Sequence, residues 1–133
     1  MGIDLGSSSI KVSVLDAAAN QVVGTATVPD QEMPMIATRA GWAEQKPELW
    51  WQHTQEAIHQ ALRPLGSGAG KKVEAIGITY QMHGLVLVNP ELEVLRPSII
   101  WCDSRAVPHG EELFEQMGPD FCLKHYLNSP GNF

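Results

Sequence analysis

Hydrophobic and polar residues alternate along much of the first part of the chain, with the two-residue period of β-strands. A short apolar run at 2–5 is interrupted by a glycine and three serines. Apolar and polar side chains then alternate strictly from Ile10 to Val14. After a turn of small and polar residues at 16–21, the stretch Val22–Val28 is rich in valine and threonine. Three strands with such short connections predict an antiparallel meander.

A helical pattern follows an irregular stretch that holds two prolines. Lys46-Pro47-Glu48 is typical of a helix start, because proline is tolerated in the first turn and an acid is favoured there. Pro64 and the glycine-rich residues 66–70 end the pattern. Trp50 and Trp51 are expected to be core anchors. The apolar residues that share one helical face are Trp50, Ala57, Ile58, Ala61 and Leu62.

Three later stretches indicate further strands. Val73–Tyr80 is apolar without clean alternation, which is typical of a strand covered on both faces. Leu85–Val88 and Pro97–Trp101 are shorter and are each followed by turn or polar residues.

A last helix is expected before Gly118-Pro119. Asp103 could cap it, and it would run to about Met117. Pro108 would remove an interior hydrogen bond, so we expect a kink there or a later helix start. The order of elements predicts an α/β fold, a mixed sheet with packed helices, in one domain with a single core.

Composition and charge narrow the class of protein. The chain is 44% hydrophobic and 18% charged, as ordinary globular proteins are. Its net charge of -6 argues against a nucleic-acid partner, because phosphate binding relies on clustered lysine and arginine. No run reaches the roughly 18 apolar residues of a membrane span, and the N-terminus lacks the basic start of an export signal. We therefore expect a cytoplasmic protein with no membrane partner, in which Cys102 and Cys122 are reduced thiols.

The first segment with recognisable chemistry runs from Asp4 to Lys11, across the turn between the first two strands. A glycine turn exposes backbone N–H groups that can hold an anion. The serine hydroxyls and Lys11 add donors, and Asp4 could hold Mg²⁺ through an oxygen or a water. A plain hairpin with a polar turn explains the same residues equally well.

Another segment, Tyr80–Gly84, directly follows a predicted strand, and open α/β sheets bind ligands at such strand ends. The side chains of Gln81 and His83 can donate and accept hydrogen bonds to hydroxyl groups. A single histidine is more often structural than functional, so this segment alone does not decide its role.

Two more segments combine aromatic and charged residues. Trp101–Arg105 follows a predicted strand and could line a sugar pocket, with an aromatic face for C–H groups and charged groups for hydroxyls. Alternatively, Asp103 and Arg105 are a helix cap and a surface ion pair. Trp42 and Glu44 precede the first helix, in a loop that could face a cleft.

Taken together and in this order, the four segments resemble the FGGY family of carbohydrate kinases over essentially the whole chain. Asp4-Leu5-Gly6-Ser7-Ser8-Ser9 with Lys11 is similar to the family's first phosphate motif. Gly41-Trp42-Ala43-Glu44-Gln45, with Pro47 and Trp50, is similar to the lead into the family's first helix.

Within that family, the segments 81–84 and 95–105 resemble those of members that phosphorylate D-xylulose. A glycerol-phosphorylating member would carry an Arg-Glu pair at 82–83. Cys102, Ser104 and Ser7 stand where Asn, Gly and Thr are commoner. These departures weaken the assignment of a substrate but not the resemblance to the family.

The resemblance implies an actin-like, ribonuclease-H-type fold, in which two similar domains close on MgATP and a sugar. Residues 1–133 would be the N-terminal part of the first domain, with the second domain absent. The general-base aspartate, a second phosphate motif and the adenosine motif are expected beyond Phe133, so the chain alone is expected to be inactive. The implied phosphate ligands, with Asp4 also organising Mg²⁺, are Asp4, Gly6, Ser7, Ser8 and Lys11. The implied sugar contacts are Met82, His83, Trp101, Asp103 and Arg105.

Several alternatives stay open at this stage. The acceptor could be D-xylulose, L-xylulose, ribulose, gluconate or a fuculose-like sugar. A different class is an actin- or chaperone-like ATPase that uses the same hairpin, although such a protein has no need of a polar segment at 81–83. A homodimer is also compatible with the sequence.

Overall fold

The computed structural model describes residues 1–131 and divides into two compact units. The first unit consists of Met1–Pro34 and Lys46–Met82. The second consists of Met35–Gln45 and the chain from His83 onward. Each unit is described by itself.

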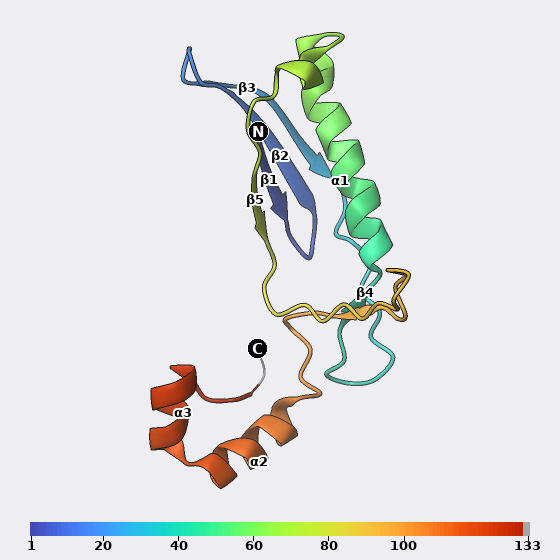
Figure 1. Ribbon diagram of the computed structural model, residues 1–133. Helices are drawn as coiled ribbons and strands as arrows, with labels where there is room; N and C mark the ends of the chain where they lie inside the picture. Colours follow the sequence, from blue (N-terminus) through green and yellow to red (C-terminus); the bar gives the residue numbers. More distant parts are fainter. Residues whose placement is uncertain (132–133) are drawn as a thin grey trace. The chain divides into compact units, whose positions relative to one another are not determined.

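The sheet of the first unit begins with the predicted meander, which is confirmed. Strands β1 (Gly2–Leu5), β2 (Ile10–Asp16) and β3 (Gln21–Val28) pair antiparallel in succession. Strand β5 (Gly77–Tyr80) then joins β1 in parallel, so the order across the sheet is β3-β2-β1-β5 (Figure 1). The predicted mixed α/β architecture is therefore present.

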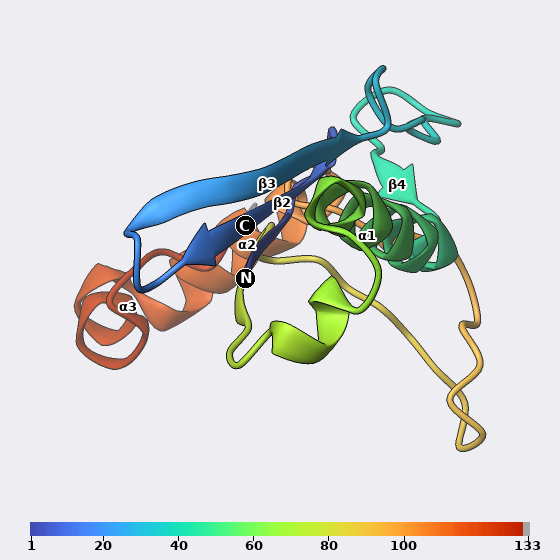
Figure 2. The same ribbon diagram turned by 90° about the horizontal axis from the view of Figure 1, so that it is seen from above.

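Helix α1 (Pro47–Leu62) packs on β2 and β3 (Figure 2) and starts where the sequence predicts. Its apolar face meets the buried side chains of the sheet as expected. A Cβ atom at Gly24 would overlap the carbonyl oxygen of Ala61, so a glycine is required for this close approach. Trp50 packs against the core, but the prediction for Trp51 is wrong, since it is 64% exposed. The buried core consists of Ile3, Ile10, Val12, Val14, Val28, Met33, Ala57 and Ala61.

The segment after α1 is less regular than predicted. The helix is followed at once by the 3₁₀ turn η1 (Arg63–Leu65) and, after residues 66–68, by a second one, η2 (Ala69–Lys72), and strand β5 begins only at Gly77. The expectation that this strand is covered on both faces is wrong, because all four of its residues are exposed. The physical reason is its position at the edge of the sheet, beyond the strands on which α1 packs.

The second unit contains a two-stranded sheet of β4 (Glu44–Gln45) and β6 (Ser98–Ile99). The predicted strand at Pro97–Trp101 is confirmed only for these two central residues. The predicted strand at Leu85–Val88 is wrong, because its ends make isolated bridges to Ile99 and Val94. Val88 folds back on Val94 through a tight turn, so the segment cannot continue along one partner strand.

Two short helices complete the second unit. Helix α2 (Val107–Met117) begins later than Asp103, as the presence of Pro108 required. Pro108 lies in its first turn, where the missing N–H breaks no hydrogen bond. Asp103 does not cap it, since the capping position is Ala106. Gly118, with a φ of 80°, ends α2, and α3 (Pro119–Tyr126) follows at once.

Candidate functional site

The serine hairpin (residues 6–9) joins β1 to β2 and has a tightly fixed backbone. The N–H of Gly6 donates to the carbonyl oxygen of Ser9 over 3.1 Å. A Cβ atom at Gly6 would lie 2.9 Å from that oxygen, so glycine is needed for the turn. The carbonyl of Ser8 accepts a hydrogen bond from Met33 N–H over 2.8 Å. The hairpin thus presents backbone and hydroxyl groups at the end of the sheet in a defined conformation.

Asp4 and Lys11 lie opposite each other on the two strands that carry this hairpin. They alternate with the buried residues Ile3, Ile10 and Val12, so they project from the face of the sheet opposite the core. Their charged groups are 3.7 Å apart, and the side chains are 44% and 58% exposed. An exposed pair of this kind adds little stability.

An open hollow with a volume of about 560 Å³ lies over this face. Thr79 of β5, which is the parallel partner of Asp4, also borders this hollow. The residues that line the hollow are Gly2, Ile3, Asp4, Lys11, Ser13, Gly77, Ile78 and Thr79. Of the predicted phosphate residues, Asp4 and Lys11 line this hollow, while Gly6, Ser7 and Ser8 lie in the adjoining hairpin and do not line it.

The segment after β5 contributes to both units. The N–H of Gln81 donates to Leu5 carbonyl over 2.8 Å, which extends the β1–β5 pairing to the start of the serine hairpin. Met82 is exposed and ends the first unit, while His83 begins the second. The structure therefore joins Met82 to the phosphate residues and groups His83 with Trp101, Asp103 and Arg105.

His83 has an unusual backbone. Its φ is 63°, in the left-handed region that a residue with a side chain seldom adopts. Such strain costs about 1–3 kcal/mol and tends to occur at functional sites. Beyond it, Leu85 pairs with Ile99 in an antiparallel bridge, which brings the exposed residues His83 and Trp101 to the same end of the pairing.

Asp103 and Arg105, two predicted sugar contacts, form a buried ion pair. The side chain of Asp103 is 2% exposed. Its Oδ2 accepts from Ala43 N–H over 2.6 Å and from Arg105 Nη2 over 2.7 Å. Its Oδ1 accepts from Arg105 N–H and Nε–H over 2.9 and 2.8 Å. Hydrogen bonds from the Arg105 side chain, and then from the two backbone N–H groups, lower the pKa of Asp103 to about 2 against the opposing effect of burial.

Glu44 completes this charge cluster, and the expectation that it faces a cleft is wrong. Its buried carboxylate accepts from Arg105 Nη2 over 2.7 Å and also pairs with Arg96. The Arg105 guanidinium lies 3.8 Å from the centre of the Trp42 ring, in cation–π contact. The hydrogen bonds that Arg105 donates to Asp103, and then the one to Glu44, raise the pKa of Arg105. We call Glu44, Arg96, Asp103 and Arg105 the buried charge cluster after its two buried carboxylates; the side chains of Arg96 and Arg105 are 40% and 18% exposed.

Sequence reasoning missed this cluster because its members are far apart along the chain. Glu44 precedes Arg96 by 52 residues and Arg105 by 61. A usable signal lay in the motifs themselves, since each pairs a tryptophan with an acid two residues later. The cluster ties residues 43–44 to residues 96–105.

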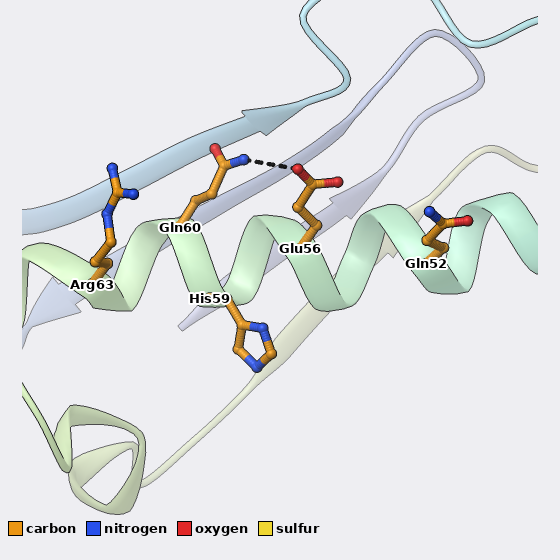
Figure 3. A pocket seen from close by; sticks show the side chains of 5 residues that line it. All are labelled: Gln52, Glu56, His59, Gln60 and Arg63. Carbon is orange, nitrogen blue, oxygen red and sulfur yellow. Dashed lines mark hydrogen bonds between the residues drawn. The ribbon is translucent and has the colours of Figure 1, made fainter.

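A second hollow lies along the exposed side of α1 and contains none of the motif residues. Figure 3 shows its side chains: Gln52, Glu56, His59, Gln60 and Arg63. Gln60 donates to Glu56 over 3.1 Å, while His59 points to a different side of the helix (Figure 3). We assign no function to this surface.

Metal, cysteine and membrane features add little. Within residues 1–131, no three His, Cys, Asp or Glu side chains gather in a way that could hold a metal ion. Cys102 and Cys122 are free thiols. None of the helices that the structure describes is long and apolar enough to cross a membrane.

The sheet order, the helix on one face and the hairpin at the end of β1 define an actin-like ATPase fold. A crystal structure of Plasmodium falciparum glycerol kinase with ADP shares it, with a TM-score of 0.83 at 18% identity over 100% of this chain and 27% of that one. The chain belongs to the FGGY family of carbohydrate kinases, whose N-terminal domain model matches residues 1–128.

Relatives in this family are more similar in sequence. The xylulose kinase of Escherichia coli (strain K12) is 39% identical over 132 residues, covering 98% of this chain and 26% of that protein. The crystal structure of a xyloylose kinase from Brucella ovis is 36% identical, with a TM-score of 0.76, over 91% of this chain and 24% of that one. The chain thus spans about a quarter of the length of the relatives it matches.

Proposed function

We propose that the protein containing this chain transfers a phosphoryl group from MgATP to a ketose, D-xylulose. The observation that carries the proposal is the position of the segment Gln81–Gly84, with its exposed Met82 and His83, directly after the strand whose pairing continues to the start of the serine hairpin. The resemblance to xylulose kinases over nearly the whole chain supports the choice of sugar. Residues 1–133 would be the N-terminal part of the first of two domains.

The phosphate end of the site would be formed by the first unit. Ser7, Ser8 and Lys11 would hold the oxygens of the transferring phosphoryl group. Gly6, whose own N–H donates to the Ser9 carbonyl, would shape the turn that positions them. Asp4 fits Mg²⁺, since this cation is commonly held by one or two carboxylates together with substrate phosphates and water. Mg²⁺ would neutralise charge on the phosphates. The exposed pair with Lys11 leaves the carboxylate of Asp4 free to do this.

The sugar end would be formed by the exposed residues Met82, His83 and Trp101. The imidazole of His83 can donate to or accept from a hydroxyl, and the face of Trp101 suits the C–H surface of a sugar. Both oxygens of Asp103 accept hydrogen bonds from within the chain. We therefore assign Asp103 and Arg105 to holding the Trp101 segment in place rather than to direct contact with the sugar.

The rest of the catalytic machinery would lie beyond Phe133. By the family resemblance this comprises the aspartate that accepts the proton of the sugar hydroxyl, a second phosphate motif and the adenosine motif. The chain alone would have no sugar-dependent turnover. A cytoplasmic location is supported by the two free thiols.

The substitution His83→Ala in the full-length protein tests the sugar assignment. Losing one hydrogen bond in a closed site costs about 1–3 kcal/mol, or roughly ten- to a hundredfold in kcat/KM for D-xylulose. ATP binding, measured by calorimetry, should barely change. His59→Ala is the matched control, because His59 is exposed on α1 away from the motif residues.

Different results would redirect the proposal. If His83→Ala behaves like the control, His83 is structural and the sugar assignment loses its main support. If the wild-type protein prefers ribulose or gluconate, the kinase class holds and D-xylulose is wrong. If ATP hydrolysis is unaffected by any sugar, the actin- or chaperone-like ATPase is the better description.

A further inference from the structure

Gln81 occupies a position that the preceding assignments leave without a role. It directly follows β5, and its backbone N–H donates to Leu5 carbonyl over 2.8 Å. Leu5 is the last residue before the serine hairpin. Gln81 therefore lies at the edge of the sheet where the hairpin begins, in the same unit as Asp4 and Lys11.

The side-chain carbonyl of Gln81 has an unmet need for a hydrogen bond. Its Oε1 atom is buried and has no hydrogen-bond partner within residues 1–131. An unpaired buried acceptor of this kind costs about 1–3 kcal/mol, and native proteins seldom keep one without a reason. The backbone N–H of Gln81 is hydrogen-bonded, so the residue is held in place while its side-chain carbonyl oxygen has no donor.

The chemistry of a carbonyl oxygen restricts what can satisfy it. It only accepts hydrogen bonds, so it cannot pair with the oxygens of a fully ionised phosphate. It equally cannot pair with the carboxylate of Asp4. An O–H or N–H donor can do so. The proposed reaction brings two O–H donors, a hydroxyl of the acceptor sugar and the water shell of Mg²⁺.

We infer that Gln81 is a binding residue for the reaction, whose side-chain carbonyl accepts a hydrogen bond from an O–H donor held beside the serine hairpin. This inference rests on the proposed kinase function. The donor is either a hydroxyl of the sugar or a water bound to the cation, and the two sources make different kinetic predictions. The residue gives up some stability of the free protein and recovers it when the donor binds.

The first test compares full-length wild-type protein with Gln81→Met, which keeps the length of the side chain and removes the acceptor. A sugar hydroxyl as donor predicts that kcat/KM for D-xylulose falls about tenfold or more while the Mg²⁺ concentration for half-maximal rate is unchanged. A cation-bound water as donor predicts that the Mg²⁺ requirement rises about tenfold at an unchanged sugar KM. Gln52→Met, at an exposed position on α1, is the control and should change neither.

The second test reads the stability of the same proteins without nucleotide, metal or sugar. If the carbonyl is unpaired, Gln81→Met relieves a desolvated acceptor, so the melting temperature stays the same or rises. A fall of several degrees would show that the amide is paired within the protein and would overturn the inference. If Gln81→Met does not fold, Gln81→Ala replaces it, because a smaller side chain introduces no clash.

The outcomes separate this inference from the proposed function. A wild-type protein that phosphorylates no sugar refutes the function, whatever Gln81 does. If the wild-type protein is active and Gln81→Met matches the control Gln52→Met in both kinetic readings, the role of Gln81 alone is refuted. A lower kcat/KM for D-xylulose, a higher Mg²⁺ requirement or both in Gln81→Met, with its stability retained, supports the role of Gln81.

Discussion

Each of the two compact units contains an aspartate paired with a basic residue, and the two pairs differ in nearly every physical respect. Asp4 and Lys11 face each other across two strands with 3.7 Å between their charged atoms, and both side chains are largely exposed. Asp103 and Arg105 are joined by three hydrogen bonds of 2.7–2.9 Å, and the carboxylate is buried. Glu44 and the Trp42 ring then hold the guanidinium of Arg105 from other sides.

The difference teaches that residue type alone does not separate a binding group from a supporting one. An exposed pair gains little from its own attraction, because water competes for both charges. It can therefore exchange its partner for a ligand at low cost. A buried pair has given up its water, so each charge depends on the other. We expect changes at the first pair to affect activity and changes at the second to affect stability.

The largest expected effect is on stability at the buried pair. Asp103→Ala leaves Arg105 buried with half of its compensating charge, and removing one member of such a pair costs about 3–5 kcal/mol. The free energy of unfolding in urea, followed by circular dichroism on the full-length protein, measures this loss. Asp4→Ala is the comparison and should lose less than about 1 kcal/mol. Equal losses would erase the distinction between the two pairs.

The next effect is on catalysis at the exposed pair. In the full-length protein, Asp4→Ala should lower kcat by about a hundredfold or more, because a group that organises the metal acts mainly in the transition state. The KM for the sugar should change far less. Steady-state kinetics at saturating Mg²⁺ measures both, with Asp30→Ala, at an exposed loop position, as the control. A kcat like that of wild type would make Asp4 a turn residue only.

The smallest effect is the pH dependence of stability. Because the pKa of Asp103 falls from 3.8 to about 2 on folding, its contribution is fully present above pH 4 and is lost as the pH falls towards 2. That shift corresponds to about 2 kcal/mol. Urea unfolding at several pH values should show the loss in wild type and a flatter profile in Asp103→Asn. The same slope in both proteins would mean that other carboxylates cause the acid sensitivity.

The features that could be predicted from the sequence are those that near neighbours decide. Strict alternation over Ile10–Val14 allows one buried face, so the meander was predictable. The apolar face of α1 follows from the helical period, and the start of α2 at Val107, next to Pro108, follows from the missing N–H of proline. The order of the motif segments was enough to indicate the family.

Only the tertiary structure decided the surroundings of individual side chains. Trp51 is as apolar as Trp50 but lies on the solvent side of α1, and the apolar residues of β5 are exposed because the strand is at the sheet edge. The buried charge cluster joins Glu44 to partners 52 and 61 residues away. Neither period nor spacing carries information over such separations, because chain folding and not local geometry brings these groups together. The sequence by itself therefore determined the antiparallel meander, the main helix and the family, while the tertiary structure decided that the carboxylate of Asp4 is exposed and that of Asp103 is buried.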